Sequence, residues 1–243
     1  MFNFCSVALA EEAVEAQPTW LQTAFKEFAE TPATVWIAVC VLLALGLVLF
    51  IVSKTSRQWN AKILSFAALS VALSFVLSCV RLYRMPTGGS VTPASMLPIM
   101  LFSAVYGVGP GLLTGLVYGI LQYFQGGWFL NVWQLILDYL LAFAALGLAG
   151  LAKKLPKKWG LYASFVIAVL GRAICAILAG VMWANDSIAK GWGLEIAGKS
   201  YSSPLLYSAV YNGFYLIPEI VICILLAVLI ARPVMTVMKK GNH

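Results

Sequence analysis

A single carboxylate, Asp138, lies in the middle of a strongly apolar stretch, residues 131–150. Such a stretch is long enough to cross a bilayer as a helix, which needs about 20 apolar residues. A charge near the bilayer centre costs about 2.5–3.5 kcal/mol on insertion scales, so it requires a partner or a function. Helical spacing puts Asn131 and Gln134 on the same face as Asp138. We therefore expect this face to border a polar pocket and not lipid.

The next two apolar stretches carry polar groups at a similar depth, Arg172 in one and Asn212 in the other. At a rise of about 1.5 Å per residue, all three groups lie roughly 12–16 Å from the helix ends on one side of the membrane. Three helices with polar groups at one level predict a shared site. The alternative is an Asp138–Arg172 ion pair that only holds the helices together. Glu219 lies deeper, and the sequence leaves open whether it is a second functional group or a satisfied buried acid.

Aromatic side chains are expected to ring this site. Their flat faces suit a planar or cationic ligand, which they bind by stacking and by cation–π contact. Aromatic residues near the ends of membrane helices are also common as interface anchors, so each one alone is weak support. The predicted ring consists of Trp128, Trp133, Trp183, Tyr139, Tyr207 and Tyr211.

The composition is that of an integral membrane protein. Hydrophobic residues make up 62% of the 243, charged residues only 10%, and the mean hydropathy is +0.91. The net charge of +7 is interpreted as Lys and Arg gathered on cytoplasmic loops, not as a nucleic-acid surface. The one histidine is His243, which argues against histidine-based catalysis and most zinc or haem sites. We predict neither an enzyme nor a bound cofactor.

Seven apolar segments indicate an all-α membrane protein. The third contains Pro98 and is expected to be tilted or irregular. The segments are 35–52, 63–80, 95–106, 111–124, 132–151, 161–183 and 205–230.

The distribution of Lys and Arg orients the chain in the plasma membrane, with the N-terminus outside and the C-terminus in the cytoplasm. Residues 1–34 are then an acidic extracellular segment, either an interfacial helix or a loosely ordered tail. Residues 35–60 are expected to form an extra transmembrane helix and a linker. Residues 61–243 are expected to form the substrate-binding membrane domain.

Two local motifs have simple interpretations. Residues 193–200, GLEIAGKS, match the phosphate-loop pattern, but they lie in a short external loop without the strand and helix that this mechanism needs. We regard the match as chance, so energy for any transport must come from a partner or a gradient. Gly111, Gly115 and Gly119 recur at intervals of four and predict close helix packing inside the protein.

From about residue 62 to residue 231, the chain resembles the thiamine-specific substrate-binding (S) component of energy-coupling-factor (ECF) vitamin transporters. The order and spacing of the matching stretches agree as well. These stretches are PTGGSVTPASMLPI at 86–99, WQLILDYLLAFAALGLAG at 133–150, GRAICAILAG at 171–180 and YSAVYNGFYLIPE at 207–219.

The resemblance implies a six-helix bundle that binds thiamine near the outer surface. It also implies three partners, namely a second membrane subunit and two ATPases that supply energy. Asp138 would meet the cationic thiamine. A small-residue pair, Ala68 and Ala72, would dock the membrane subunit, although periodicity alone also allows internal packing. The other positions that the resemblance assigns to the ligand site are Tyr139, Arg172, Gly180, Trp183, Tyr207 and Asn212.

Three departures from the family pattern stand out. Some members carry histidine where this chain has Ala176, and the outer aromatic is Trp183 where Ala184 is the matching position. The first sixty residues lie outside the resemblance. Alternatives are an S component for another vitamin or for a pyrimidine precursor of thiamine, and a membrane partner protein without a transport role.

Overall fold

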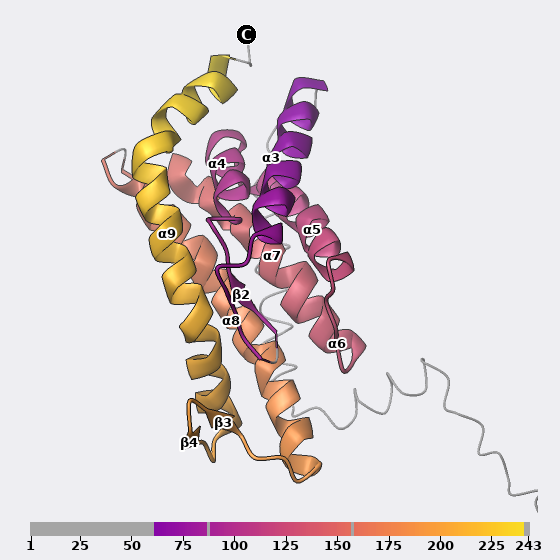
Figure 1. Cartoon of the computed structure of the whole chain (residues 1–243). Coiled ribbons are helices and arrows are strands. Elements are labelled where there is room, and N and C mark those ends of the chain that lie inside the picture. Colours follow the sequence, from indigo (N-terminus) through magenta and orange to yellow (C-terminus); the bar gives the residue numbers. More distant parts are fainter. Residues whose placement is uncertain (1–60, 87, 157, 241–243) are drawn as a thin grey trace, which may run out of the picture.

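The computed structural model describes residues 61–86, 88–156 and 158–240 (Figure 1). The predicted N-terminal segment 1–34 and the predicted extra helix and linker at 35–60 lie outside the described residues. The described residues form a bundle of helices with two small antiparallel hairpins. The helices are α3 (Ala61–Cys79), α4 (Leu97–Tyr106), α5 (Val108–Phe124), α6 (Val132–Leu135), η1 (Ile136–Leu141), α7 (Ala142–Ala144), η2 (Ala145–Lys153), α8 (Gly160–Ala189) and α9 (Pro204–Lys240).

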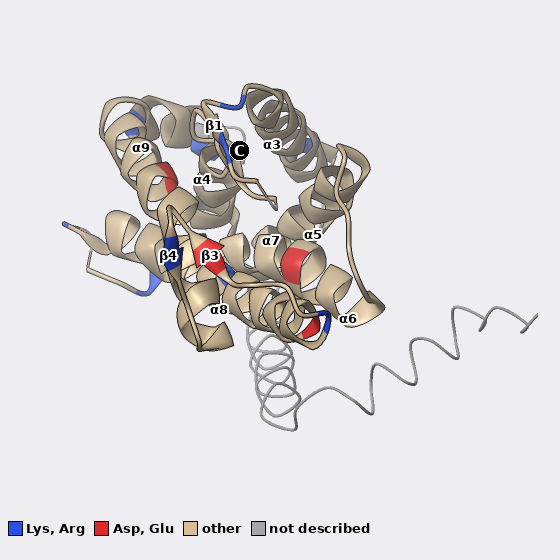
Figure 2. Ribbon diagram, turned by 60° about the horizontal axis from the view of Figure 1, so that its bottom comes forward, with Lys and Arg blue, Asp and Glu red and all other residues tan. Residues whose placement is uncertain are grey.

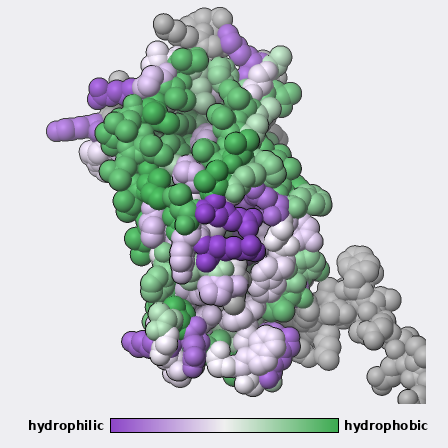
Figure 3. Space-filling view, in the orientation of Figure 1, coloured by the Kyte–Doolittle hydropathy of each residue, from purple (hydrophilic) through white to green (hydrophobic). Residues whose placement is uncertain are grey.

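Four described helical stretches are long and apolar enough to cross a membrane, as the hydropathy pattern predicts. They are Ala61–Cys79, Val132–Lys153, Gly160–Ala189 and Pro204–Lys239. Most of the helical ribbon carries no charge (Figure 2). Hydrophobic residues cover much of the face in Figure 3, with a hydrophilic patch across its middle. Large apolar side chains such as Leu73 and Leu229 are exposed, which suits a surface that faces lipid.

The short helix α4 lies at the centre of the bundle. Every residue of α4 except Pro98 is buried. Proline is tolerated in the first turn of a helix because its missing N–H has no intrahelical partner there. Pro98 occupies that turn, so the proline begins the helix and does not break it, and the expected irregularity is wrong. The expected tilt stays a prediction.

The helix that carries Asp138 is not a regular α-helix. A π-helical segment, η1, follows α6, and the 3₁₀ segment η2 follows α7. Short π-helical segments often occur at functional sites. Asn131 does not share the face of Asp138 as predicted. Instead it caps α6, and its Oδ1 accepts a hydrogen bond from the backbone N–H of Gln134 at 2.8 Å.

Glycines of α5 pack directly on the backbone of this irregular helix. An added Cβ at Gly115 would overlap the carbonyl oxygen of Phe143, and one at Gly119 would overlap that of Tyr139. Gly111 lies against Gly147 in the same way. The prediction that these glycines serve internal packing is confirmed. Their close approach sets the position of η1 relative to α5.

Two hairpins complete the described fold. Strands β1 (Tyr83–Arg84) and β2 (Ser90–Val91) pair between α3 and α4, and β3 (Glu195–Ile196) pairs with β4 (Lys199–Ser200) between α8 and α9. The turn of the second hairpin contains Gly198 with a positive φ of 78°. The phosphate-loop match therefore folds as a hairpin, which lacks the strand–loop–helix context of that motif.

Candidate ligand-binding site

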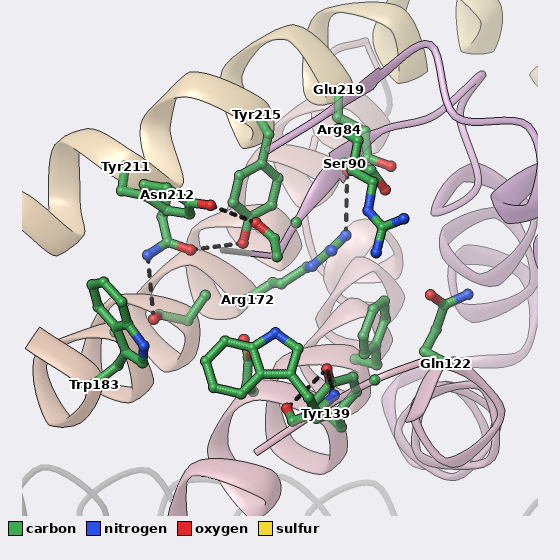
Figure 4. Close-up of a pocket in the computed structure, with 18 of the residues that line it drawn as sticks. Arg84, Ser90, Gln122, Tyr139, Arg172, Trp183, Tyr211, Asn212, Tyr215 and Glu219 are labelled. Carbon is green, nitrogen blue, oxygen red and sulfur yellow. Dashed lines mark hydrogen bonds and ion pairs between the residues drawn. The ribbon is translucent and has the colours of Figure 1, made fainter. Parts of the chain in front are cut away.

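A cavity of about 370 Å³ opens between the helices and the β1–β2 hairpin. This volume lies within the usual range for small-molecule sites. Side chains from α5, η1, α8 and α9 line it, together with the segment from α3 to α4 (Figure 4). The elements that line it are far apart in the sequence, so the site exists only in the folded bundle.

Asp138 lies on the cavity wall, as predicted. Within the described part of the chain, its carboxylate forms no ion pair and no hydrogen bond. A carboxylate in a membrane-spanning segment is costly unless it meets a partner. The cavity therefore presents a negative charge that is available to a ligand.

Arg172 also lines the cavity, but its carboxylate partner is Glu219 and not Asp138. Its Nη1 lies 3.5 Å from Oε2 of Glu219, and its Cζ lies 4.4 Å from the ring centroid of Phe143. The alternative of an Asp138–Arg172 ion pair is therefore wrong. α9 carries Glu219 toward α8, at a position where the guanidinium reaches it.

Glu219 is fully enclosed, with 1% of its side chain exposed. Its Oε1 accepts hydrogen bonds from the hydroxyl groups of Thr92 and Ser95, and its Oε2 faces Arg172. The question that the sequence left open is thereby answered in part. Glu219 is a satisfied buried acid, and it also contributes to the cavity wall.

Asn212 is held in place by three neighbours. Its Nδ2 donates to the carbonyl oxygens of Ala176 and Ser208, at 3.3 and 2.9 Å. Its Oδ1 accepts from the hydroxyl of Tyr215 at 2.6 Å, which leaves the second lone pair of that oxygen free for a further bond. An amide with so many protein contacts is oriented before any ligand arrives.

Aromatic rings flank the cavity on two sides. Trp183, Tyr207 and Tyr211 form a stacked row, with centroid distances of 5.7 Å and 5.9 Å between successive rings. On the other side, the hydroxyl of Tyr139 accepts from the backbone N–H of Trp128 at 3.2 Å. Both groups border the cavity, as predicted.

Trp133 is the predicted ring member that does not line the cavity. It packs instead beside a small apolar cluster that includes Leu137 and Met182. Its neighbour Gln134 does line the cavity. Gly180, predicted from the resemblance, does border the cavity.

Several cavity residues were not predicted. Arg81, Arg84 and the segment 88–90 come from the connection between α3 and α4, and Gln122 and Gln125 come from the end of α5. The spacing of the two glutamines, three residues apart on one helix face, was a usable signal. The connection offered no periodicity, because its strands are only two residues long, although residues 88–90 lie in one of the stretches that carry the resemblance.

The small-residue pair on α3 lies at the surface. Ala68 and Ala72 are exposed, whereas Ser70, Ser74 and Ser78 on the same helix are buried. Packing within the described part of the bundle therefore does not account for the alanines. Their role in docking a partner stays a prediction.

No three His, Cys, Asp or Glu side chains come together within residues 61–86, 88–156 and 158–240, so no metal ligands are assigned there.

Comparison with known proteins gives consistent matches. Residues 64–239 match the family described as thiamine transporter protein (Thia_YuaJ). The thiamine transporter ThiT of Bacillus subtilis (strain 168) is 35% identical over 170 residues, which cover 64% of this chain and 83% of that protein. A solved structure of ThiT from Listeria monocytogenes has a TM-score of 0.54 at 21% identity and covers 73% of this chain and 93% of that one. At this identity, the structural likeness concerns the fold alone.

Proposed function

The chain belongs to the thiamine transporter protein family, and on this premise we propose that it captures thiamine in the cavity beside Asp138. The observation that carries the proposal is the carboxylate of Asp138, which faces the cavity without an ion-pair partner among the described residues. Membership in this family confirms the resemblance to thiamine-specific S components that the sequence motifs indicate. The chain is accordingly a thiamine-transporting membrane protein, and we propose no reaction chemistry for it.

The chemistry of thiamine suits the groups around the cavity. Thiamine has a cationic thiazolium ring, a flat aminopyrimidine and a hydroxyethyl tail. Asp138 offsets the positive charge, and the low dielectric of a membrane protein strengthens that attraction. The stacked row ending at Trp183 offers an aromatic face to a flat ring. The remaining acceptor capacity of Asn212 is available to the amino group of the pyrimidine.

The first test is a titration of the detergent-purified protein with thiamine, followed by tryptophan fluorescence. Trp128 and Trp183 line the cavity and report its occupancy. We expect saturable quenching at submicromolar thiamine. Asp138→Asn keeps the shape of the side chain but removes its charge, so thiamine binding should weaken about tenfold to a hundredfold, the usual worth of a charged hydrogen bond.

Asp186→Asn is the matched control. Asp186 is an exposed acid of α8 that pairs with Lys190 and does not border the cavity, so this variant should bind thiamine like the unchanged protein. If folded protein does not respond to thiamine, the thiamine assignment is wrong. If Asp138→Asn binds thiamine with unchanged affinity, Asp138 does not offset the thiazolium charge. If it instead binds a neutral pyrimidine precursor tightly where the unchanged protein ignores thiamine, the precursor is the ligand.

We also propose that the chain works as the S component of an ECF-type importer, in the plasma membrane, with the N-terminus outside. In this arrangement residues 61–243 form the six-helix binding domain, preceded by the segment 1–34 and the extra helix within 35–60. The exposed pair Ala68 and Ala72, on the apolar outer face of α3, docks a second membrane subunit that two ATPases drive. Small residues allow close approach of helices in lipid, which supports this choice of surface.

A further inference from the structure

Two carboxylates, the partly buried Asp138 and the buried Glu219, share one guanidinium in the wall of the cavity. Asp138 on η1, Arg172 on α8 and Glu219 on α9 all border the cavity. Figure 4 shows Arg172 directed toward Glu219. α8 packs against both η1 and α9. The three side chains together carry a formal charge of −1, so the partner that Arg172 takes decides which carboxylate stays unpaired.

The structure resolves this competition in favour of Glu219. Arg172 lies 3.5 Å from Glu219, and its guanidinium is held over the ring of Phe143. Only 11% of the Arg172 side chain is exposed. A guanidinium confined in this way keeps one partner, because leaving it would expose a buried charge without compensation.

Glu219 is itself fixed by the segment between β2 and α4. The hydroxyl groups of Thr92 and Ser95 donate to one carboxylate oxygen, so the other oxygen is directed to Arg172. The two further arginines at the cavity, Arg81 and Arg84, are exposed. Water and salt screen exposed charges, so these two arginines neutralise Asp138 much less than a buried guanidinium would.

We propose that Glu219 is a positioning residue: by holding Arg172, it keeps the guanidinium away from Asp138 and reserves that carboxylate for a cationic ligand. The inference rests on the proposed function, since it assigns a role in recognition of the thiazolium charge. In this role Glu219 acts through Arg172 and needs no contact of its own with the ligand. Arg172 was expected from the resemblance to belong to the ligand site. In this proposal it is the cation that Glu219 keeps paired.

Glu219→Gln tests the proposal, because glutamine retains the shape and can still accept from Thr92 and Ser95. Without its counter-charge, Arg172 turns to Asp138 and competes with the ligand. We expect thiamine affinity to fall about tenfold to a hundredfold, the range for loss of a charged hydrogen bond. A thiamine isostere with a neutral thiophene ring in place of the thiazolium should lose less than about threefold, because it does not depend on the charge of Asp138.

A second variant separates this role from a structural one. In Glu219→Gln/Arg172→Met, no guanidinium remains to neutralise Asp138, so thiamine affinity should recover most of what Glu219→Gln alone loses. Replacing both members of a buried ion pair with uncharged groups is often well tolerated, so this variant is expected to fold. Glu195→Gln, an exposed acid of β3 outside the cavity, is the matched control and should leave both affinities unchanged.

The outcomes are distinct. Equal losses for thiamine and the neutral isostere in Glu219→Gln, or no recovery in the double variant, would overturn the proposal in favour of a purely structural ion pair. Unchanged thiamine binding by Glu219→Gln, with normal binding by the unchanged protein, would overturn the role of Glu219 alone. Absence of thiamine binding by the unchanged protein would overturn the proposed function and, with it, this role.

Discussion

Replacing Gly180 with alanine tests how closely α8 and α9 must approach for the site to form. A Cβ at this position would overlap Oγ of Ser208, and it would lie 3.2 Å from Cβ of Ser208 and 3.3 Å from Nδ2 of Asn212. Ser208 cannot turn aside freely, because its hydroxyl donates to the carbonyl oxygen of Ile177 at 2.7 Å. The added methyl group therefore pushes α9 away from α8, and Asn212 moves with it.

The size of the effect follows from two costs. Inserting a methyl group into packed structure costs typically about 1–3 kcal/mol, and breaking the hydrogen bond of Ser208 costs about 1 kcal/mol. If the binding free energy of thiamine falls by the packing cost alone, binding by Gly180→Ala weakens roughly 5- to 150-fold. Isothermal titration calorimetry of the detergent-purified protein measures the change directly, and a thermal melt shows how much of the cost appears as lost stability.

Two further variants decide whether the reasoning is right. Gly180→Ala/Ser208→Ala removes the overlapping Oγ, leaves contacts of 3.2 and 3.3 Å, and should recover most of the binding. Gly193→Ala introduces the same methyl group where no atom lies within 4 Å, and should bind normally. Unchanged binding by Gly180→Ala, or no recovery in the double variant, would refute the link between the approach of the two helices and the site.

Three other predictions follow from the described contacts. Gly147→Ala forces a methyl group onto backbone atoms of α5, which should lower the melting temperature well below that of Gly193→Ala; equal melting temperatures would contradict the close packing. Tyr215→Phe removes the hydroxyl that donates to Asn212, and calorimetry should show thiamine binding weakened by roughly three- to tenfold, about the worth of one hydrogen bond; an unchanged affinity would show that Asn212 needs no such support. Ala68→Trp alters only an exposed position, so it should retain thiamine binding in detergent but abolish uptake in cells that supply the partner subunits, whereas normal uptake would exclude this docking surface.

The sequence predicted the long helices because an apolar run of membrane length has few other structures available to it. It did not predict that the helix around Asp138 is π-helical and then 3₁₀. The hydrogen-bond register of that helix accommodates the backbone contacts with Gly115 and Gly119, which are long-range contacts. A hydropathy pattern averages over several residues and therefore misses a local change of register.

Asp138, Arg172 and Asn212 line one cavity, as predicted, because a polar group in a membrane helix is too costly to be incidental. The partner of Arg172 was not predicted. Helical spacing does place Glu219 on the face of Asn212 and Tyr215, at seven and four residues. Distance from the helix end does not reveal this partner, because depth alone does not show how α9 is rotated. Cavity residues from the β1–β2 connection, such as Arg84, stayed unpredicted because no periodicity relates a loop to a helix.

The order of synthesis gives the final helix a special part in biogenesis. Asp138 and Arg172 enter the membrane before α9, which begins at Pro204 and brings Asn212 and Glu219. A nascent chain that stops short of α9 therefore leaves Asp138 as the cavity carboxylate available to Arg172, in surroundings where an unpaired charge costs about 2.5–3.5 kcal/mol. Insertion of α9 at once closes the cavity wall and satisfies Arg172. Chains truncated before Pro204 should accordingly fail to bind thiamine, because they lack Asn212 and leave Arg172 to neutralise Asp138.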